Sequence, residues 1–247
     1  MINTFQILGM SAGSPQLDQG VSSYMISCSN YDIMIDCGEG TYLEWLKHKY
    51  SWNKLRYIFI THLHPDHIGG LINLLFYKKL SNSNTPIIIY GPKRLKEYVD
   101  FNLIMQNINL SYSYKILTNP KFEKLNDDIF VESAIMKHSV KCLSYRFNAL
   151  NFSIVIATDT LPTDNTVYLA SNCDILVHEC TFMNYNLEKA KQTYHSTLND
   201  ALYIAEKAKA KRLILSHFGN EIKNKIDNVS FNNQKCLINN NRINCNG

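Results

Sequence analysis

The feature that most constrains this chain is a short histidine-rich segment that directly follows an apolar stretch. Residues 57–60 are apolar and typical of a buried strand, and His62, His64, Asp66 and His67 come immediately after it. In an extended segment His62 and His64 point the same way, because side chains alternate with a period of two. Imidazole nitrogen and carboxylate oxygen are ligands that suit Zn²⁺. Four such ligands in one loop, with His62 and His64 in one group and Asp66 and His67 in the other, predict two neighbouring metal ions. The alternative is a polar loop whose histidines are solvated.

The length and charge of the chain limit what can surround this segment. With 247 residues, 45% of them apolar, the chain can bury one large core. We expect a single domain over residues 1–247, with its core over about residues 4–219 and a polar tail over residues 221–247. Basic residues exceed acidic ones by 25 − 21 = 4. This excess permits an anionic substrate but is far below that of a dedicated nucleic-acid coat.

Cysteine usage and the lack of long apolar runs indicate the compartment. The seven cysteines are scattered and never form a C-x-x-C pair, which argues against a disulfide framework and for a reducing environment. The first residues lack the basic and apolar regions of a signal peptide. No apolar run approaches membrane-spanning length. We therefore expect a cytoplasmic protein with no membrane partner.

The apolar pattern and the turn residues predict an alternation of strands and helices. Strands are expected over residues 4–8, 22–28, 32–35, 57–60, 87–90, 112–117, 129–136, 143–147, 152–156, 175–177 and 213–215. Helices are expected over residues 41–48, 68–80, 93–101 and 197–208, and an edge hairpin within residues 229–238. This order indicates an α/β fold with two sheets packed face to face and helices outside, a four-layer αββα sandwich. Catalytic groups would gather at the edge where the strands end.

Five further histidines lie outside the central segment. His48 falls on the polar side of a predicted surface helix, where we expect it to be solvated. His138, His178, His195 and His217 each follow a predicted strand or begin a helix, which are places where a rigid scaffold fixes loop residues. Taken alone, His138 could instead be a surface histidine after an edge strand, and His195 a histidine at a helix start.

At these residues the chain resembles the metallo-β-lactamase superfamily and, within it, ribonuclease Z, the 3′-end processing nuclease of transfer RNA precursors. The resemblance covers residues 5–219. The five superfamily motifs are matched, in order, by Asp36, by the H-x-H-x-D-H run of His62, His64, Asp66 and His67, by His138, by Asp159 and by His217. Residues 9–15, 178–182 and 195–197 resemble segments that are more particular to ribonuclease Z.

This resemblance implies a dinuclear metal centre. One zinc ion would take His62, His64 and His138, and the other would take Asp66, His67 and His217. Asp159 would bridge the two ions together with a water or hydroxide. Two Zn²⁺ are expected, with Mn²⁺ as an alternative, since two cations about 3.5–4 Å apart activate a shared water and hold a phosphoryl group for in-line attack. From the residues alone, Asp159 could instead be a turn residue that caps the next segment.

The resemblance also implies roles around the metals. Asp36 would hydrogen-bond a ligand imidazole and fix its tautomer. Glu179 and His195 look like an acid pair, because a carboxylate orients a neighbouring imidazole and raises its pKa. His195 would then donate a proton to the departing ribose 3′-oxygen, and Asp66 is counted with this pair among the catalytic residues. His178 is either a core residue or hydrogen-bonded near the site.

Two segments depart from ribonuclease Z. The opening loop carries an anion, Asp18, where the family keeps a cation nearby, which is unfavourable for holding a phosphate backbone. Ribonuclease Z also has a protruding arm between its third and fourth motifs that clasps transfer RNA. Here His138 and Asp159 are separated by only 20 residues, filled by two predicted strands and a tight turn.

We therefore expect a zinc-dependent phosphodiesterase of the ribonuclease Z-like branch that uses a metal-bridging hydroxide on RNA or on a small nucleotide. A homodimer is expected from the family. The alternatives are a transfer RNA 3′-processing endoribonuclease and a hydrolase of cyclic nucleotides, sulfate or other esters. A non-catalytic metal-binding or partner-binding module would need a decayed ligand set, whereas every ligand position here is filled.

Overall fold

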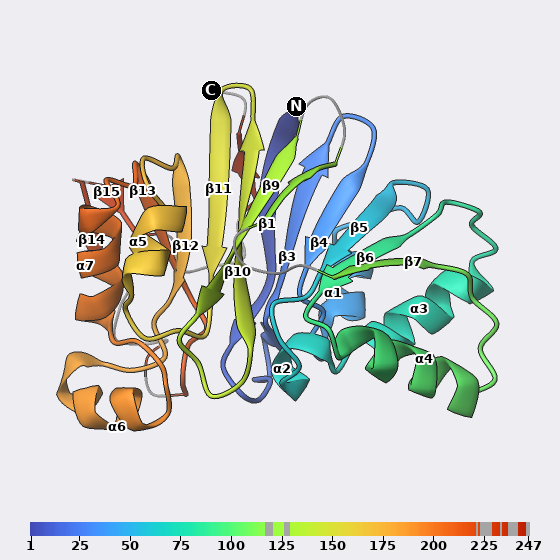
Figure 1. Cartoon of the computed structure of the whole chain (residues 1–247), viewed down its shortest axis with the longest axis horizontal. Coiled ribbons are helices and arrows are strands. Elements are labelled where there is room, and N and C mark those ends of the chain that lie inside the picture. Colours follow the sequence, from blue (N-terminus) through green and yellow to red (C-terminus); the bar gives the residue numbers. More distant parts are fainter. Residues whose placement is uncertain are drawn as a thin grey trace. The chain divides into compact units, whose positions relative to one another are not determined.

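The computed structural model describes residues 1–116, 121–125, 129–220, 222, 229–232, 234–236 and 242–245. The chain forms two compact units, each a β-sheet with its own helices (Figure 1). The first unit consists of Ile2–Leu117 and Asn240–Gly247, and the second consists of Met1 and Thr118–Asn239. Among the described residues, no helix combines the length and apolarity that crossing a membrane requires.

The first unit is a sheet with strand order β16-β1-β3-β4-β5-β6-β7, and the short β2 pairs with β1. Its strands are β1 (Ile2–Ser11), β2 (Gly20–Val21), β3 (Ser23–Cys28), β4 (Asp32–Ile35), β5 (Leu55–Phe59), β6 (Ile88–Gly91), β7 (Ser113–Ile116) and β16 (Ile243–Asn244). Its helices are α1 (Thr41–Lys47), α2 (Pro65–Ile68), α3 (Leu71–Leu80) and α4 (Leu95–Met105). Strands β4 to β7 run parallel, so the loops that follow β4 and β5 leave the sheet at the same edge.

The core of the first unit lies between this sheet and its helices. Apolar side chains from β4, β5 and β6 pack against α1, α3 and α4 in one buried cluster that includes Trp45, Ile58, Leu71, Ile89 and Val99. These strands are almost entirely apolar, as expected for parallel strands covered on both faces. The buried strands hold the residues that follow them in a fixed position.

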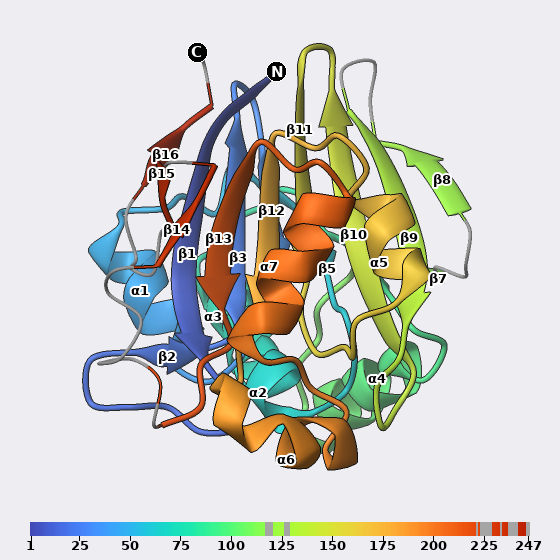
Figure 2. The same cartoon turned by 90° about the vertical axis from the view of Figure 1, so that its left-hand side faces the viewer.

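The second unit has a sheet with strand order β13-β12-β11-β10-β9-β8 and a separate two-stranded hairpin. Its strands are β8 (Lys121–Lys124), β9 (Phe130–Met136), β10 (Cys142–Ala149), β11 (Phe152–Ala157), β12 (Ile175–Glu179), β13 (Arg212–Ser216), β14 (Ser230–Phe231) and β15 (Gln234–Lys235). Its helices are α5 (Asp164–Leu169), the 3₁₀ helix η1 (Asn184–Asn186), α6 (Leu187–Gln192) and α7 (Leu198–Lys207). Helices α5 and α7 lie against the sheet (Figure 2). Strands β11, β12 and β13 are parallel, so their carboxyl ends share one edge.

The segment between His138 and Asp159 is a simple hairpin. Strands β10 and β11 pair antiparallel, with Ala149 opposite Phe152, and only two residues connect them. Every residue of this segment is described. The expected absence of a protruding arm here is therefore confirmed.

The helix predicted over residues 68–80 begins later, at Leu71 of α3, and the short helix α2 precedes it, separated from it by Gly69 and Gly70. The chain after β4 approaches this break closely, because a Cβ atom on Gly70 would lie 2.4 Å from a backbone carbonyl oxygen. Cys37 N–H donates to the His67 carbonyl (2.8 Å), and Gly70 N–H donates to the Cys37 carbonyl (2.9 Å). The glycine pair thus lets the histidine-rich segment pack directly on the end of β4.

Other differences from the prediction concern short or polar elements. Helix α4 covers Leu95–Met105 rather than residues 93–101, and β8, α5, η1 and α6 are not predicted. The predicted edge hairpin is present as β14 and β15, while Leu117 of the strand expected over residues 112–117 lies outside the described residues. The tail also contains β16, which pairs with β1 so that Ile243 lies opposite Phe5. Ile243 is buried, so this part of the tail packs on the first sheet.

The amino terminus of α7 is closed by a reciprocal cap between Thr197 and Asp200. The Thr197 side chain accepts from Asp200 N–H, and the Asp200 carboxylate accepts from Thr197 N–H at 2.8 Å. This capping box satisfies two backbone donors that a helix end otherwise leaves without partners.

Thr197→Ala removes half of this cap. We expect it to lower the free energy of unfolding by about 1 kcal/mol, the usual cost of losing a threonine cap. Urea denaturation followed by circular dichroism measures this as a lower midpoint with an unchanged slope. Glu206→Ala, an exposed change in the same helix, is the control and is expected to stay within about 0.5 kcal/mol of the parent. Equal stability of the two variants would contradict the capping role.

Candidate metal centre

The first unit positions four predicted ligands just beyond the end of β5. His62 and His64 lie in the extended segment before α2, and Asp66 and His67 lie in α2 itself. Nε2 of His62 is 3.0 Å from Nδ1 of His64, and Nε2 of His67 is 3.6 Å from Oδ2 of Asp66. His62 and His67 are fully buried. The rings of His62 and His67 are also close, with centroids 4.1 Å apart, so the four side chains form one compact group within this unit.

A buried carboxylate, Asp36, holds this group of side chains together. It follows β4, and its Oδ2 atom lies 2.7 Å from Nδ1 of His67. The backbone N–H of Thr61 donates to Oδ1 of Asp36 at 2.8 Å, and the Thr61 hydroxyl lies 2.9 Å from Oδ2. The same hydroxyl is 3.0 Å from Nδ1 of His62. Asp36 thus orients His67 directly and reaches His62 through a threonine.

The opening loop of the chain contacts one of these ligands. Gly13 has a φ of +69° and directs its backbone N–H at Oδ2 of Asp66, at 2.8 Å. A backbone donor at this distance makes an ordinary hydrogen bond to the carboxylate and fixes its direction. The loop of small residues after β1 therefore helps to orient Asp66.

In the second unit, three predicted ligands come from three strand ends. His138 follows β9, Asp159 follows β11 and His217 follows β13. Nε2 of His217 lies 3.3 Å from Oδ1 of Asp159, and Nε2 of His138 lies 3.8 Å from Oδ2. Each carboxylate oxygen of Asp159 therefore faces a different imidazole. This is the arrangement that a bridging carboxylate would need.

Glu179 and His195 form a contacting pair in the same unit. The Glu179 carboxylate is fully buried at the end of β12, and Nδ1 of His195 lies 3.2 Å from both of its oxygens. Burial alone would raise the pKa of Glu179, but the charge and hydrogen bond of His195 outweigh it, so this pKa lies below its ordinary value. One ligand-type atom each from Asp159, His195 and His217 lie within 4.8 Å of one another. The acid pair is therefore adjacent to two of the predicted ligands.

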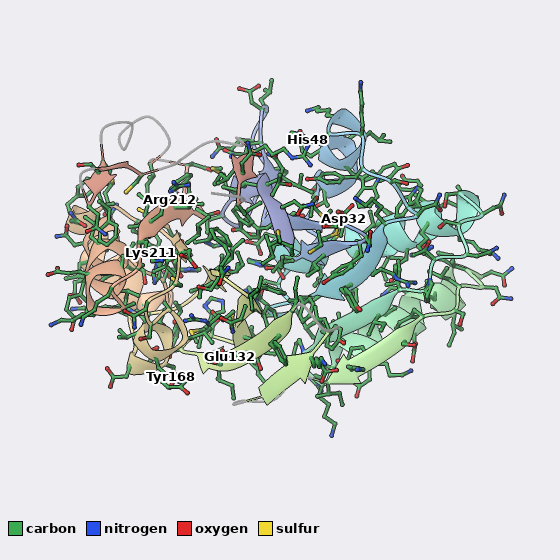
Figure 3. The ribbon with its side chains drawn as sticks, turned by 90° about the horizontal axis from the view of Figure 1, so that it is seen from above. Asp32, His48, Glu132, Tyr168, Lys211 and Arg212 are labelled. Carbon is green, nitrogen blue, oxygen red and sulfur yellow. The ribbon has the colours of Figure 1, made fainter. Side chains whose placement is uncertain are left out.

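Two histidines lie apart from this group. His178 is buried in β12, and its Nδ1 is 2.8 Å from the Glu179 carbonyl oxygen. Burial lowers the pKa of His178, so the side chain is a neutral core residue. His48, labelled in Figure 3, follows α1. About a third of its side chain is exposed. Its Nε2 atom lies 3.8 Å from the Glu44 carboxylate. The residue is exposed, as the sequence predicts.

The orientation of the imidazoles fits metal binding. Nδ1 of His67 faces Asp36, and Nδ1 of His138 faces the backbone carbonyl of Tyr194 at 3.2 Å. Both acceptors require a proton on Nδ1, which leaves Nε2 as the nitrogen with a lone pair. Buried imidazoles and carboxylates in this form are a donor set that Zn²⁺ takes readily.

Three of the predicted site residues have left-handed backbone conformations. Asp36, Asp159 and His217 have φ values of +55°, +56° and +53°, and each follows a strand. A non-glycine residue in this region costs roughly 1–3 kcal/mol. The turn this conformation makes at the end of a strand sets the direction in which the side chain leaves the sheet.

The sequence interpretation assigned no individual role to several residues that contact Asp66, Asp36 or Glu179. These are Gly13, Thr61, Thr160, Thr181 and Ser196. A hydroxyl or a backbone N–H carries no periodic signal. Gly13, Thr181 and Ser196 do lie in the three segments that resemble ribonuclease Z, whereas Thr61 and Thr160 are indicated only by their positions just after strand ends.

Comparisons with known proteins show the family to which this chain belongs. The family model described as "Anti-Pycsar protein Apyc1" matches residues 4–238. Ribonuclease BN of Proteus mirabilis is 30% identical, over 85% of this chain and 87% of that protein. Ribonuclease Z of Enterococcus faecalis is 31% identical, over 86% of this chain and 85% of that protein.

A solved structure extends the likeness to three dimensions. Human tRNase Z, short form, has a TM-score of 0.86 and 26% identity, over 98% of this chain and 99% of that one. The resemblance to ribonuclease Z and the expected fold class are both confirmed. The chain therefore belongs to the metallo-β-lactamase-fold hydrolases, in the family that the Apyc1 model describes and whose relatives include ribonucleases Z and BN.

Proposed function

We propose that this chain is a dinuclear metal-dependent phosphodiesterase that prefers short diesters, such as cyclic nucleotides or dinucleotides, to transfer RNA precursors. The observation that carries the proposal is the buried Glu179–His195 pair, whose imidazole lies next to Asp159 and His217. Hydrolysis of an alkyl phosphodiester needs an acid at the leaving oxygen, and a carboxylate-paired imidazole suits that role.

The proposed ligand assignment follows the sequence motifs. One cation would be held by His62, His64 and His138, the other by Asp66, His67 and His217, and Asp159 would bridge them. The pairing of His62 with His64 within one unit supports it, as do the two imidazoles on Asp159 within the other. Zn²⁺ is the proposed metal and Mn²⁺ the alternative, since nitrogen and carboxylate donors suit both.

The chain's own residues would handle the proton. When bound, two cations would supply Lewis-acid activation of water and of the phosphoryl oxygens. Glu179 holds His195 through Nδ1 and stabilises its protonated form, so Nε2 carries the proton to be delivered. As the phosphorus–oxygen bond breaks, the departing ribose oxygen takes this proton and leaves as an alcohol. Water supplies the oxygen that remains on phosphorus.

The size of the substrate is argued from what the chain offers for binding. The hairpin of β10 and β11 fills the whole segment between His138 and Asp159, so it provides no clasp for transfer RNA. Asp18 in the opening loop is exposed and anionic. Remote binding energy is what favours a long substrate and its rate of reaction. A short diester requires little of this remote binding energy.

The proposal has alternatives, and it extends to the compartment and the oligomeric state. A transfer RNA 3′-processing endoribonuclease is the second candidate, favoured by the relatives named ribonuclease Z and BN. Sulfate or other ester hydrolysis and a non-catalytic binding module are the remaining alternatives. A cytoplasmic homodimer completes the proposal. The seven cysteines, which are all buried and in no disulfide, support a reducing compartment.

The proposed metal centre predicts the metal content of the purified protein. Protein prepared without chelators is expected to hold close to two equivalents of zinc or manganese per chain, measured by elemental analysis. Asp159→Ala should lower both equivalents, and His138→Ala should lower mainly one. His48→Ala, outside the predicted centre, is the control and should change neither. A ratio well below one that does not rise when metal is added would contradict the dinuclear centre.

The acid role predicts a dependence on the leaving group. His195→Ala should lower kcat by about 10²–10⁴-fold on a diester with a ribose leaving group, because such an oxygen must be protonated. The loss should be much smaller with a nitrophenolate, which leaves readily without a proton. Steady-state kinetics with the two substrates measures the difference. Equal losses would show that His195 positions the substrate rather than acting as the acid.

The substrate proposal is tested by comparing kcat/KM on a transfer RNA precursor, a short single-stranded RNA and cyclic nucleotides at one salt concentration. We expect weak, salt-sensitive binding of the precursor and no preference for it over the small diesters, because the described segment between His138 and Asp159 is a short hairpin with no clasping arm. Cleavage after the discriminator base with a kcat/KM orders of magnitude higher would establish the transfer RNA function instead. Failure to turn over any diester with two metals bound would favour an ester or sulfate substrate.

A further inference from the structure

Two threonine hydroxyls have matching surroundings in the two units. In the first unit, Oγ1 of Thr61 lies 2.9 Å from the Asp36 carboxylate and 3.0 Å from Nδ1 of His62. In the second unit, Oγ1 of Thr181 lies 2.7 Å from the Glu179 carboxylate and 2.9 Å from Nδ1 of His217. Each hydroxyl is thus placed between a buried carboxylate and a predicted ligand imidazole.

Counting hydrogen atoms at Thr181 decides the tautomer of His217. A hydroxyl has a single proton to donate and can accept through its lone pairs, whereas an ionised carboxylate only accepts. The Thr181 hydroxyl lies 2.7 Å from the Glu179 carboxylate and 3.1 Å from the backbone carbonyl oxygen of His217, and both of these groups only accept. Its proton therefore goes to one of them, and Nδ1 of His217 donates to the hydroxyl. The proton on Nδ1 leaves the lone pair on Nε2, the atom that lies 3.3 Å from Asp159.

The same count applies to Thr61. Its hydroxyl donates to Asp36, so Nδ1 of His62 donates to the hydroxyl and the lone pair lies on Nε2. That nitrogen is the atom 3.0 Å from Nδ1 of His64. In both units, the threonine therefore leaves the lone pair of the histidine on Nε2. This is the nitrogen that lies near another predicted ligand.

Each hydroxyl also lies near a second imidazole that contacts the same carboxylate. The Thr181 hydroxyl is 3.4 Å from Nδ1 of His195, which contacts Glu179. The Thr61 hydroxyl is 3.3 Å from Nδ1 of His67, which contacts Asp36. Glu179 thus orients the acid imidazole directly and the ligand imidazole of His217 through Thr181. One carboxylate positions both groups relative to each other.

We infer that Thr61 and Thr181 are positioning residues that fix the Nδ1–H tautomers of His62 and His217, so that each presents Nε2 to a metal ion. This inference rests on the proposed function only in that the two histidines ligate metal. Partners of this kind typically change metal affinity by 10–100-fold when they are removed. Neither threonine is itself a ligand.

The tautomers are measured first in the unaltered chain. Protein labelled with ¹⁵N-histidine is examined by two-dimensional NMR without metal and with added zinc, and His62→Gln and His217→Gln assign the two signals. We expect both rings to carry the proton on Nδ1 in both samples. A proton on Nε2 of either ring in the metal-free protein would overturn the inference for that ring.

Variants then test the effect on metal affinity. Thr181→Val keeps the shape of the side chain but removes the hydroxyl, and Thr181→Ser restores it. Competition with a chromophoric chelator is expected to show one zinc equivalent bound about 10–100-fold more weakly in the valine variant, and near-normal affinity in the serine variant. Equal affinity of valine and serine variants that are both folded by circular dichroism would refute the positioning role.

A substitution of Thr61 in the first unit can be compared directly with the substitution of Thr181 in the second. Thr61→Val should weaken the equivalent held by His62, and Thr181→Val the one held by His217, so the double variant should lose affinity at both. Loss of the same single equivalent in both variants would contradict the separate roles. These readouts need no substrate. A chain that binds two metals but cleaves no diester would refute the proposed function and leave this inference standing.

Discussion

The burial of the Glu179 carboxylate is the constraint on which the second unit's site depends. A carboxylate removed from water costs several kcal/mol unless donors compensate for its lost hydration. Here the compensation comes from the backbone N–H groups of Thr160 and Ser196, the hydroxyl of Thr181 and the imidazole of His195. These donors come from the ends of β11 and β12 and from the segment before α7. Satisfying one buried charge therefore brings together the strand ends that carry the site.

Much of this arrangement could be predicted because each predicted ligand is a distinctive side chain at the end of an apolar strand. The spacing of His62 and His64 is visible in the sequence, and their Nε2 and Nδ1 atoms lie 3.0 Å apart. The rest depends on partners far apart in the sequence. Thr181 reaches His217 across 36 residues, and the two residues of β16, Ile243–Asn244, are too short to show a period. The break at Gly70 reflects how closely two backbone segments approach, which residue propensity does not reveal.

The hairpin of β10 and β11 links structure to the choice of substrate. Its strands are fully paired from Tyr145–Ile156 to Ala149–Phe152, and the sheet that carries Asp159 is complete with this short connection. The cost of closing a flexible loop rises by only about 0.6 kcal/mol for each doubling of its length. A binding arm can therefore be added to or lost from such a connection while the strands that hold the predicted ligands are preserved. In the proposed function, the chemistry of the site and the size of its substrate are separable for this reason.

The left-handed conformations of Asp36, Asp159 and His217 have an evolutionary consequence. Glycine adopts this backbone region at no steric cost, so at each position it would relieve strain of roughly 1–3 kcal/mol. At Asp36, however, glycine would leave the buried N–H and hydroxyl of Thr61 without their acceptor, which costs about 1–3 kcal/mol for each group. The strain and the hydrogen bonds therefore offset each other at this position. Selection for stability alone would not replace Asp36 by glycine, even in a descendant released from catalysis.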